Sequence, residues 1–138
     1  MEIDISQRQG NVLVTIIRVE GEFDAASSDL VKDSAHEVIQ DGAEYVLLDL
    51  SGVPFISSSG IRVIYSLYNQ LHPKKSGEAG KAVARDMREG TYTASRLKIL
   101  NPTNQVMNVL RMIGIDSYIE IYESEDDAMA AFIVSGSN

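Results

Sequence analysis

The sequence predicts an α/β fold in which about four helices pack on one mixed, mostly parallel β-sheet. Short segments rich in β-branched residues alternate along the chain with longer segments in which apolar residues recur every three or four positions. The first two strand-like segments follow each other directly, whereas later ones are separated by helical segments, which favours a hairpin followed by parallel crossovers. Because 138 residues with 44% hydrophobic content suffice for one core, we expect a single domain over residues 1–138.

The N-terminal segments predict a hairpin and a helix. Residues 2–6 alternate polar and apolar, residues 12–19 are rich in β-branched side chains, and Gly10-Asn11 indicates the turn between them. After Gly21-Glu22-Phe23-Asp24, a helix is expected to end at Asp41-Gly42. Its expected cap is Ser27 or Ser28, and its expected apolar face consists of Leu30, Val31, Ala35, Val38 and Ile39.

The central part of the chain predicts a buried strand, a serine-rich turn and a second helix. Residues 45–48 form an apolar run that suits a strand covered on both faces, and residues 49–54 are expected to break it. The turn is Ser57-Ser58-Ser59-Gly60, at the start of a helix, where free backbone N–H groups favour negative charge. The apolar face of that helix is expected to comprise Ile61, Ile64, Tyr65, Tyr68 and Leu71.

Residues 73–93 interrupt this regular pattern. They contain a proline, three glycines and five basic residues without an apolar period, which predicts a flexible insertion with at most a short helix at 81–89. More often than not such a loop is a solvated spacer, although its basic charge could dock an acidic partner.

The C-terminal part predicts strand, helix, strand and helix. A short strand is expected at 96–100, and Asn101-Pro102 is expected to cap a helix and place proline at its first position. That helix has apolar residues up to Ile113 and should end at Gly114. Residues 118–122 alternate as a last strand, and Ser124 should cap an acidic final helix.

Composition excludes several classes of function. Without cysteine the chain has no disulfide or thiolate chemistry, and its two histidines lie outside any metal-ligand spacing, so we expect no metal and no cofactor. A net charge of −8 argues against nucleic acid. No stretch approaches the roughly 18 apolar residues of a membrane span, and the N-terminus lacks a signal-peptide pattern, so we expect a cytoplasmic protein with no membrane contact.

The serine turn does not have the surroundings of a catalytic nucleophile. Ser58 lacks the glycine two residues upstream that a nucleophile elbow requires, and Gly60 stands alone, without a phosphate-binding glycine pattern. His36 in mid-helix and His72 at a helix end are not placed as a triad base. We therefore expect no enzymatic activity. The purely structural interpretation of these serines is that they cap the helix.

Two aspartates occupy ends of predicted strands. Asp24 and Asp49 both follow strand residues, at the sheet edge where functional loops gather in parallel sheets. Taken alone, each is more readily explained as a turn or cap carboxylate.

Several motifs together resemble a known family. Gly21-Glu22-Phe23-Asp24, the run from Leu48 to Ile61 (LDLSGVPFISSSGI) and the run from Val109 to Asp116 (VLRMIGID) are similar to the signature of bacterial anti-sigma factor antagonists, the STAS domain family. The resemblance covers residues 1–72 and 95–133.

The resemblance implies a phosphorylation-switched binding protein with a mixed sheet and helices. Unphosphorylated members bind an anti-sigma factor that is usually also a serine kinase, and a serine phosphatase resets the switch. The family phosphoserine aligns with Ser58, with Ser57 and Ser59 as alternatives, and Asp24 aligns with the aspartate beside it. Expected partner contacts are Asp24, Ser57, Ser58, Ser59, Gly60 and Arg62. The competing interpretation is a phosphorylation-independent STAS scaffold or regulatory module of a stress-signalling assembly or transporter.

One departure from the family motif falls next to the expected phosphosite. Ser57 stands where the family has an aspartate, so one negative charge is missing. Recognition by the kinase is then expected to differ, or the phosphate to move to Ser57 or be lost. The insertion at 73–93 is a second departure.

Overall fold

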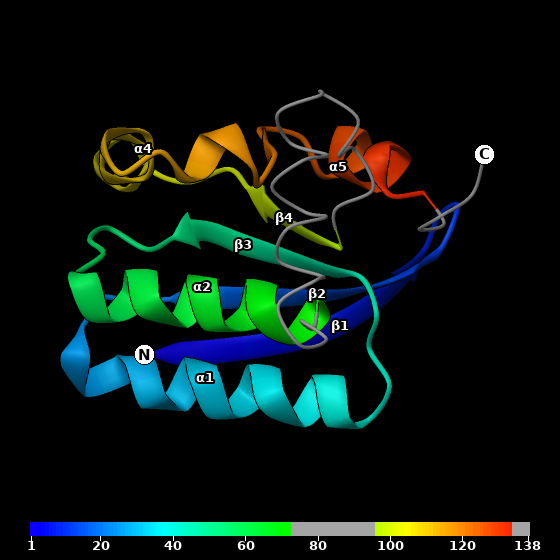
Figure 1. Cartoon of the computed structure of the whole chain (residues 1–138), viewed down its shortest axis with the longest axis horizontal. Coiled ribbons are helices and arrows are strands. Elements are labelled where there is room, and N and C mark those ends of the chain that lie inside the picture. The colour runs from blue at the N-terminus through cyan, green and yellow to red at the C-terminus, as the bar shows by residue number, and fades with distance from the viewer. Residues whose placement is uncertain (73–95, 134–138) are drawn as a thin grey trace, which may run out of the picture.

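The computed structural model describes residues 1–72 and 96–133, so the expected insertion at 73–93 and its helix at 81–89 lie outside the described residues. The described residues form a five-stranded mixed sheet with four α-helices, which confirms the predicted fold class (Figure 1). The elements are β1 (Glu2–Gln9), β2 (Leu13–Glu20), α1 (Ala25–Gln40), β3 (Val46–Gly52), α2 (Ser58–Leu71), β4 (Leu97–Leu100), α4 (Asn104–Met112), the 3₁₀ turn η1 (Ile115–Ser117), β5 (Ile121–Tyr122) and α5 (Glu125–Ala131).

The sheet has the strand order β1-β2-β3-β4-β5, with β1 antiparallel to β2 and all later pairs parallel. The helices α1 and α2 run side by side along one face, and α5 packs on the other (Figure 1). The larger core lies between the sheet and α1, α2 and α4, and a smaller core lies under α5. Because both faces are covered over β3, its residues from Val46 to Leu50 are all buried, as the apolar run predicts.

The central strand is longer than expected. It continues to Gly52, so the predicted break at Asp49 is wrong. Asp49 is buried within the strand, and its carboxylate oxygen accepts a hydrogen bond of 2.9 Å from the backbone N–H of Ser51. This bond satisfies a buried polar group locally, which allows an aspartate inside a central strand.

Two helices begin at other residues than predicted. The helix α1 begins at Ala25 with Asp24 as its N-cap, one turn before the predicted Ser27 or Ser28, and Leu30 is half exposed, not part of the apolar face. The helix α4 begins at Asn104 with Thr103 as N-cap, so the expected cap at Asn101-Pro102 is wrong. The positive φ of 47° at Asn101 turns the chain first.

The last predicted strand is also shorter. Of residues 118–122, only Ile121 and Tyr122 pair with β4, because the chain before them is wound into η1, where Ile119 N–H donates to the carbonyl of Ile115 at 2.9 Å. The predicted helix stop at Gly114 (φ 83°) and the cap at Ser124 are confirmed.

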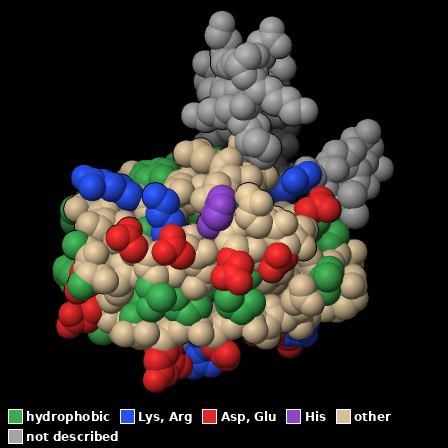
Figure 2. Space-filling model, turned by 90° about the horizontal axis from the view of Figure 1, so that it is seen from below, with side chains coloured by type: hydrophobic (Ala, Val, Ile, Leu, Met, Phe, Trp, Pro, Cys, Tyr) green, Lys and Arg blue, Asp and Glu red, His purple; other side chains and the backbone are tan. Residues whose placement is uncertain are grey.

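Acidic side chains gather on the α1 side of the molecule. Exposed carboxylates recur every four residues at Asp29, Asp33, Glu37 and Asp41, on one face of the helix and its end. Figure 2 shows a row of acidic side chains across the face that α1 forms. Within the described ranges, no helix is long and apolar enough to cross a membrane.

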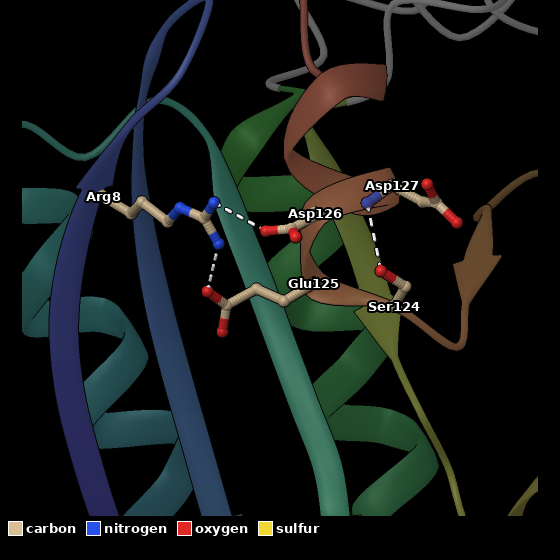
Figure 3. Close-up of polar contacts among 5 residues, drawn as sticks. All are labelled: Arg8, Ser124, Glu125, Asp126 and Asp127. Atoms are coloured by element: carbon tan, nitrogen blue, oxygen red, sulfur yellow. Dashed lines mark hydrogen bonds and ion pairs between the residues drawn. The ribbon is translucent and has the colours of Figure 1, made fainter.

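An arginine ties the N-terminal hairpin to the last helix. The Arg8 guanidinium on β1 donates to Glu125 at 2.5 Å and to Asp126 at 2.7 Å, both in the first turn of α5 (Figure 3). The same turn is capped by Ser124, which accepts from Asp127 N–H at 3.4 Å. The carboxylates raise the pKa of Arg8 above its ordinary value.

The smaller core contains a buried cation. Lys98 on β4 has no exposed surface, forms an ion pair with the half-exposed Glu120, and lies 5.1 Å from the ring centroid of Phe132 and 5.9 Å from that of Tyr122. A buried ammonium depends on its counter-ion, because desolvation of an unpaired charge is costly.

We therefore expect Glu120→Gln to destabilise the chain more than Lys98→Met. Glu120→Gln leaves an uncompensated ammonium and should lower the unfolding free energy by about 1–3 kcal/mol. This value is smaller than for a fully buried pair because Glu120 is half exposed. Lys98→Met should stay within about 1 kcal/mol of wild type. Urea unfolding followed by circular dichroism measures both. Equal losses would mean that Lys98 contributes by packing alone.

His72 joins the end of α2 to the start of β4. Its Nδ1 lies 3.0 Å from the carbonyl oxygen of Tyr68, and its Nε2 accepts the backbone N–H of Arg96 at 2.9 Å. The ring therefore carries its proton on Nδ1 and is held neutral. Burial lowers its pKa, helped by the positive charges of Arg96 and Lys98 and opposed by the hydrogen bond to Tyr68.

This lowered pKa predicts a pH-dependent stability. The folded chain disfavours the charged imidazolium, so stability is full above the unfolded-state pKa of about 6.5 and falls as the pH is lowered below it. Urea midpoints between pH 7.5 and 5.5 should decrease for wild type and vary less for His72→Gln. The control variant is His36→Gln. Among the described residues the His36 ring is hydrogen-bonded only to Gln70, so this variant should retain the wild-type change of urea midpoint with pH.

Candidate functional site

Two loops, one before α1 and one before α2, are joined at the carboxyl edge of the sheet. Phe23 and Ile56 form an isolated parallel bridge. The Phe23 N–H donates to the carbonyl of Phe55, and the Ser57 N–H donates to the carbonyl of Phe23, both at 2.9 Å. Asp24 and Ser57, each one residue beyond the bridged pair, therefore stand beside each other at the starts of two helices.

Asp24 is a complete helix cap. Its carboxylate oxygen Oδ1 accepts the N–H of Ala26 at 3.0 Å and of Ser27 at 3.2 Å, while Ser27 Oγ accepts the N–H of Asp24 at 3.1 Å. This reciprocal capping box satisfies the first N–H groups of α1. Asp24 thus combines a structural role with a negative charge next to the serine turn.

The helix α2 starts without such a cap. Ser57 occupies the N-cap position, but its side chain makes no capping hydrogen bond, and its Oγ is buried without a hydrogen-bond partner among the described residues. The N–H groups of the first turn consequently receive no side-chain acceptor from the cap. Such a helix start keeps its donors and its positive dipole end available to an anion.

Gly60 brings the first turn of α2 against the bridge. A Cβ atom at this position would lie 2.7 Å from Ile56 Cγ1 and 2.8 Å from the carbonyl oxygen of Phe23. Gly60 is itself buried, so the structure explains its presence by close packing. Its expected contact with a partner stays a prediction.

The exposed face of α2 continues from the turn. Ser58 is exposed at the first helical position, Ser59 is half-buried, and Arg62 is exposed four residues after Ser58, on the same face. One turn further, Tyr65 is partly exposed, not core-facing as predicted, and its ring stacks on that of Tyr118 at 6.1 Å between centroids. Burial, together with the hydrogen bond to Tyr65, raises the pKa of Tyr118.

The structure adds three residues that sequence reasoning missed. Phe55 is exposed beside the bridge, Tyr118 supports Tyr65, and Thr103 Oγ donates to the carbonyl of Val53 at 2.8 Å, which holds the loop before α4 next to the loop after β3. Only Phe55 had a sequence signal, since it is a large apolar residue in a turn between glycine and serines. The other two depend on tertiary contacts.

The arrangement offers a hydroxyl, open N–H groups and an arginine, and in the described part of the chain both histidines are engaged in other contacts. His36 Nδ1 lies 3.1 Å from Gln70 Oε1, and both nitrogens of His72 are engaged elsewhere. Among the described residues, no group of three or more His, Asp or Glu side chains could hold a metal ion. These features suit binding, or modification of an exposed serine.

Comparison with known proteins identifies the family. The family model of the STAS domain matches residues 2–78, so the chain belongs to the STAS domain family. An anti-sigma F factor antagonist from Paenibacillus polymyxa is 27% identical over 130 residues, which cover 94% of this chain and 92% of that protein.

Solved structures agree on the fold. An anti-sigma factor antagonist from Mycobacterium paratuberculosis superposes with a TM-score of 0.68 at 19% identity, covering 94% of this chain and 93% of that one. The Bacillus cell fate determinant SpoIIAA in its phosphorylated form has a TM-score of 0.59 at 17% identity, covering 93% and 96%.

The starts of α1 and α2 should respond differently when their N-cap residues are replaced. Asp24→Ala should lower the unfolding free energy by about 1–2 kcal/mol because two hydrogen bonds are lost, whereas Asp24→Asn should retain most of the stability, since asparagine caps equally well. Ser57→Ala removes no hydrogen bond and should change stability by less than about 0.5 kcal/mol. Chemical denaturation of the three variants tests this. A loss for Ser57→Ala as large as that for Asp24→Ala would show that Ser57 caps α2 in solution.

Proposed function

We propose that this chain is an anti-sigma factor antagonist whose binding is switched by phosphorylation of Ser58. In its unphosphorylated form it binds, in the cytoplasm, an anti-sigma factor that is also a serine/threonine kinase, and so releases the sigma factor for transcription. The kinase phosphorylates Ser58 and the complex separates. A serine phosphatase restores the binding form.

The observation that carries this proposal is the exposure of Ser58 and its position at the start of α2. It is exposed at the first position of a helix whose start has no side-chain cap. A kinase needs an accessible hydroxyl, and a phosphate at a helix start finds free N–H donors and a favourable dipole. Ser57, whose hydroxyl is buried, and half-buried Ser59 are the weaker candidates.

The charge of the phosphate explains how the switch works. A phosphoserine carries about −1.5 to −2 charges at neutral pH. Arg62, one turn along the same helix face, and the first-turn N–H groups stabilise this charge in the free chain. The fold is therefore expected to survive modification.

A docked partner meets a different situation. Its surface over Ser58 would bury the phosphate next to the carboxylate of Asp24, which lies across the Phe23–Ile56 bridge. Arg62 carries a single positive charge, so part of the phosphate charge stays unbalanced, and its burial costs several kcal/mol. Each 1.4 kcal/mol is a tenfold loss of affinity. Dissociation follows without any unfolding of the antagonist.

The neighbouring surface suits a protein partner. Phe55 lies in the loop before Ser58 and Tyr65 follows Arg62 on α2, and both side chains expose aromatic area. Aromatic and arginine residues are enriched in interfaces. We infer that Phe55, Asp24, Ser58, Arg62 and Tyr65 form the docking surface. Ser57, Ser59 and Gly60 shape the turn between them.

Site-resolved phosphorylation tests the switch. Wild-type chain incubated with Mg²⁺-ATP and a lysate of its source bacterium should gain one phosphate, located by peptide mass spectrometry at Ser58, and Ser58→Ala should gain none. The anti-sigma factor captured by Ser58→Ala, once purified, should bind phosphorylated wild type at least about 10-fold more weakly than unmodified wild type by calorimetry.

The matched controls are Ser57→Ala and Ser59→Ala. Both should still be phosphorylated, which separates Ser58 from its neighbours, and all three variants should melt within a few degrees of wild type. Retained labelling of Ser58→Ala would move the switch to Ser57 or Ser59. Capture of an anti-sigma factor with equal affinity before and after phosphorylation would instead favour the phosphorylation-independent scaffold.

A further inference from the structure

The first strand is an open edge of the sheet. Among the described residues, β1 pairs only with β2, through eight consecutive register positions from Glu2–Glu20 to Gln9–Leu13 without a bulge. All of its residues except the half-buried Ile3 are exposed, and it contains no proline. A regular edge of this length presents a row of unpaired N–H and carbonyl groups that can accept another strand. The opposite edge, β5, has only two residues.

Apolar surface accompanies this edge. Ile5 is 43% exposed and Leu13 48% exposed, and together with Val38 and Ala43 they line a hollow of about 680 Å³ between the hairpin and the end of α1. Because residues alternate between the two faces of a strand, Ile3, Ile5 and Gln7 lie on the same face as this hollow. The other face of β1 carries Glu2, Asp4, Ser6 and Arg8.

We propose that β1 pairs antiparallel with β1 of a second copy of this chain, with Ile5 of one copy opposite Ile5 of the other. A two-fold axis through this pair makes the surface self-complementary, as a symmetric dimer requires. Ile3 then stands opposite Gln7, at the mouth of the hollow. On the other face, Glu2 stands opposite Arg8 and Asp4 opposite Ser6.

The neighbouring registers fit less well. A shift that brings Ile3 opposite Ile5 also places Asp4 directly opposite Asp4, and like charges facing across strands are destabilising. A shift in the other direction places Ile5 opposite Gln7 and leaves both apolar side chains without an apolar partner. The register centred on Ile5 alone combines an apolar pair at the axis with no facing like charges.

Net charge makes the dimer dependent on salt. Each chain carries −8, and Asp41 and Glu44 border the hollow, so two copies repel each other at low ionic strength. Salt screens this repulsion, and the affinity should increase as salt is added. In the strand order, β2 separates β1 from β3, and the proposed pairing uses none of the residues assigned to the switch at Ser58.

Sedimentation equilibrium of the purified full chain tests the proposal. Wild type should show a reversible monomer–dimer equilibrium that strengthens when salt is added. Ile5→Lys should be monomeric, because it places two ammonium groups opposite each other at the axis. A wild-type chain that stays monomeric up to about 1 mM in high salt, where even a millimolar affinity would be seen, overturns the proposal.

Ser6 provides a test of the register at an exposed position that should not affect folding. Ser6→Lys creates two pairs with Asp4 across the interface and should tighten the dimer by about 2- to 30-fold, whereas Ser6→Asp faces Asp4 and should weaken it by a similar factor. In the register shifted toward the turn, Ser6 of one copy faces Ser6 of the other, and Ser6→Lys would weaken the dimer. That result contradicts the proposed pairing.

Met112→Lys is the control for loss of an exposed apolar residue. Met112 is 82% exposed at the end of α4, the helix that follows β4, and β4 is separated from β1 by β2 and β3. Its replacement should leave the monomer–dimer equilibrium unchanged. Circular dichroism of each variant confirms folding. Dimerisation that is lost with Met112→Lys and kept with Ile5→Lys would place the interface elsewhere and overturn the proposal.

Discussion

The two hydrogen bonds between Phe23 and the Phe55–Ser57 segment determine where the candidate site is formed. They extend the parallel pairing of β2 and β3 by one bridge, so that both helices begin at the same level of the sheet edge. Gly60 then allows the first turn of α2 to approach the carbonyl of Phe23, where a side chain would collide. Asp24 and Ser57 stand beside each other because of this backbone arrangement, and neither side chain is needed to create it.

Much of this fold could be predicted from the sequence because its strands differ in how they are buried. The apolar run in β3 and the helical period of α2 identify the central strand and its crossover without any homologue. The ends of elements are harder, since Asp24, Ser27 and Ser28 could each cap α1. The bridge at Phe23 holds the preceding chain extended and so selects Asp24, which is a tertiary effect. Likewise, residues 118–122 alternate as a strand should, but η1 takes up the chain before Ile121.

Side-chain environments at the site and in the core could be predicted only in part. The serine turn and Asp24 follow from their places at strand ends, whereas the buried hydroxyl of Ser57 and the stacking of Tyr65 on Tyr118 depend on how loops approach one another. Lys98 is a further example, because one lysine between apolar residues indicates an alternating strand with one wet face. Here α5 covers that face, and Phe132 and Glu120 surround the ammonium.

Two features that lower the stability of this chain lie at places assigned a function. Among the described residues, an uncapped helix start and a buried hydroxyl without a hydrogen-bond partner lie at Ser57, next to the exposed Ser58, and a strand edge with an exposed isoleucine and no second partner strand lies at β1. Elsewhere the same chain caps α1 and α5 and pairs its buried Lys98, whereas α4 also begins without a side-chain cap because Thr103 Oγ donates to the carbonyl of Val53. Local rules are thus followed at α1, α5 and Lys98, and two of the exceptions occur where another molecule would complete the missing interactions. A phosphate or a docked protein would satisfy the start of α2, and a second strand would satisfy β1.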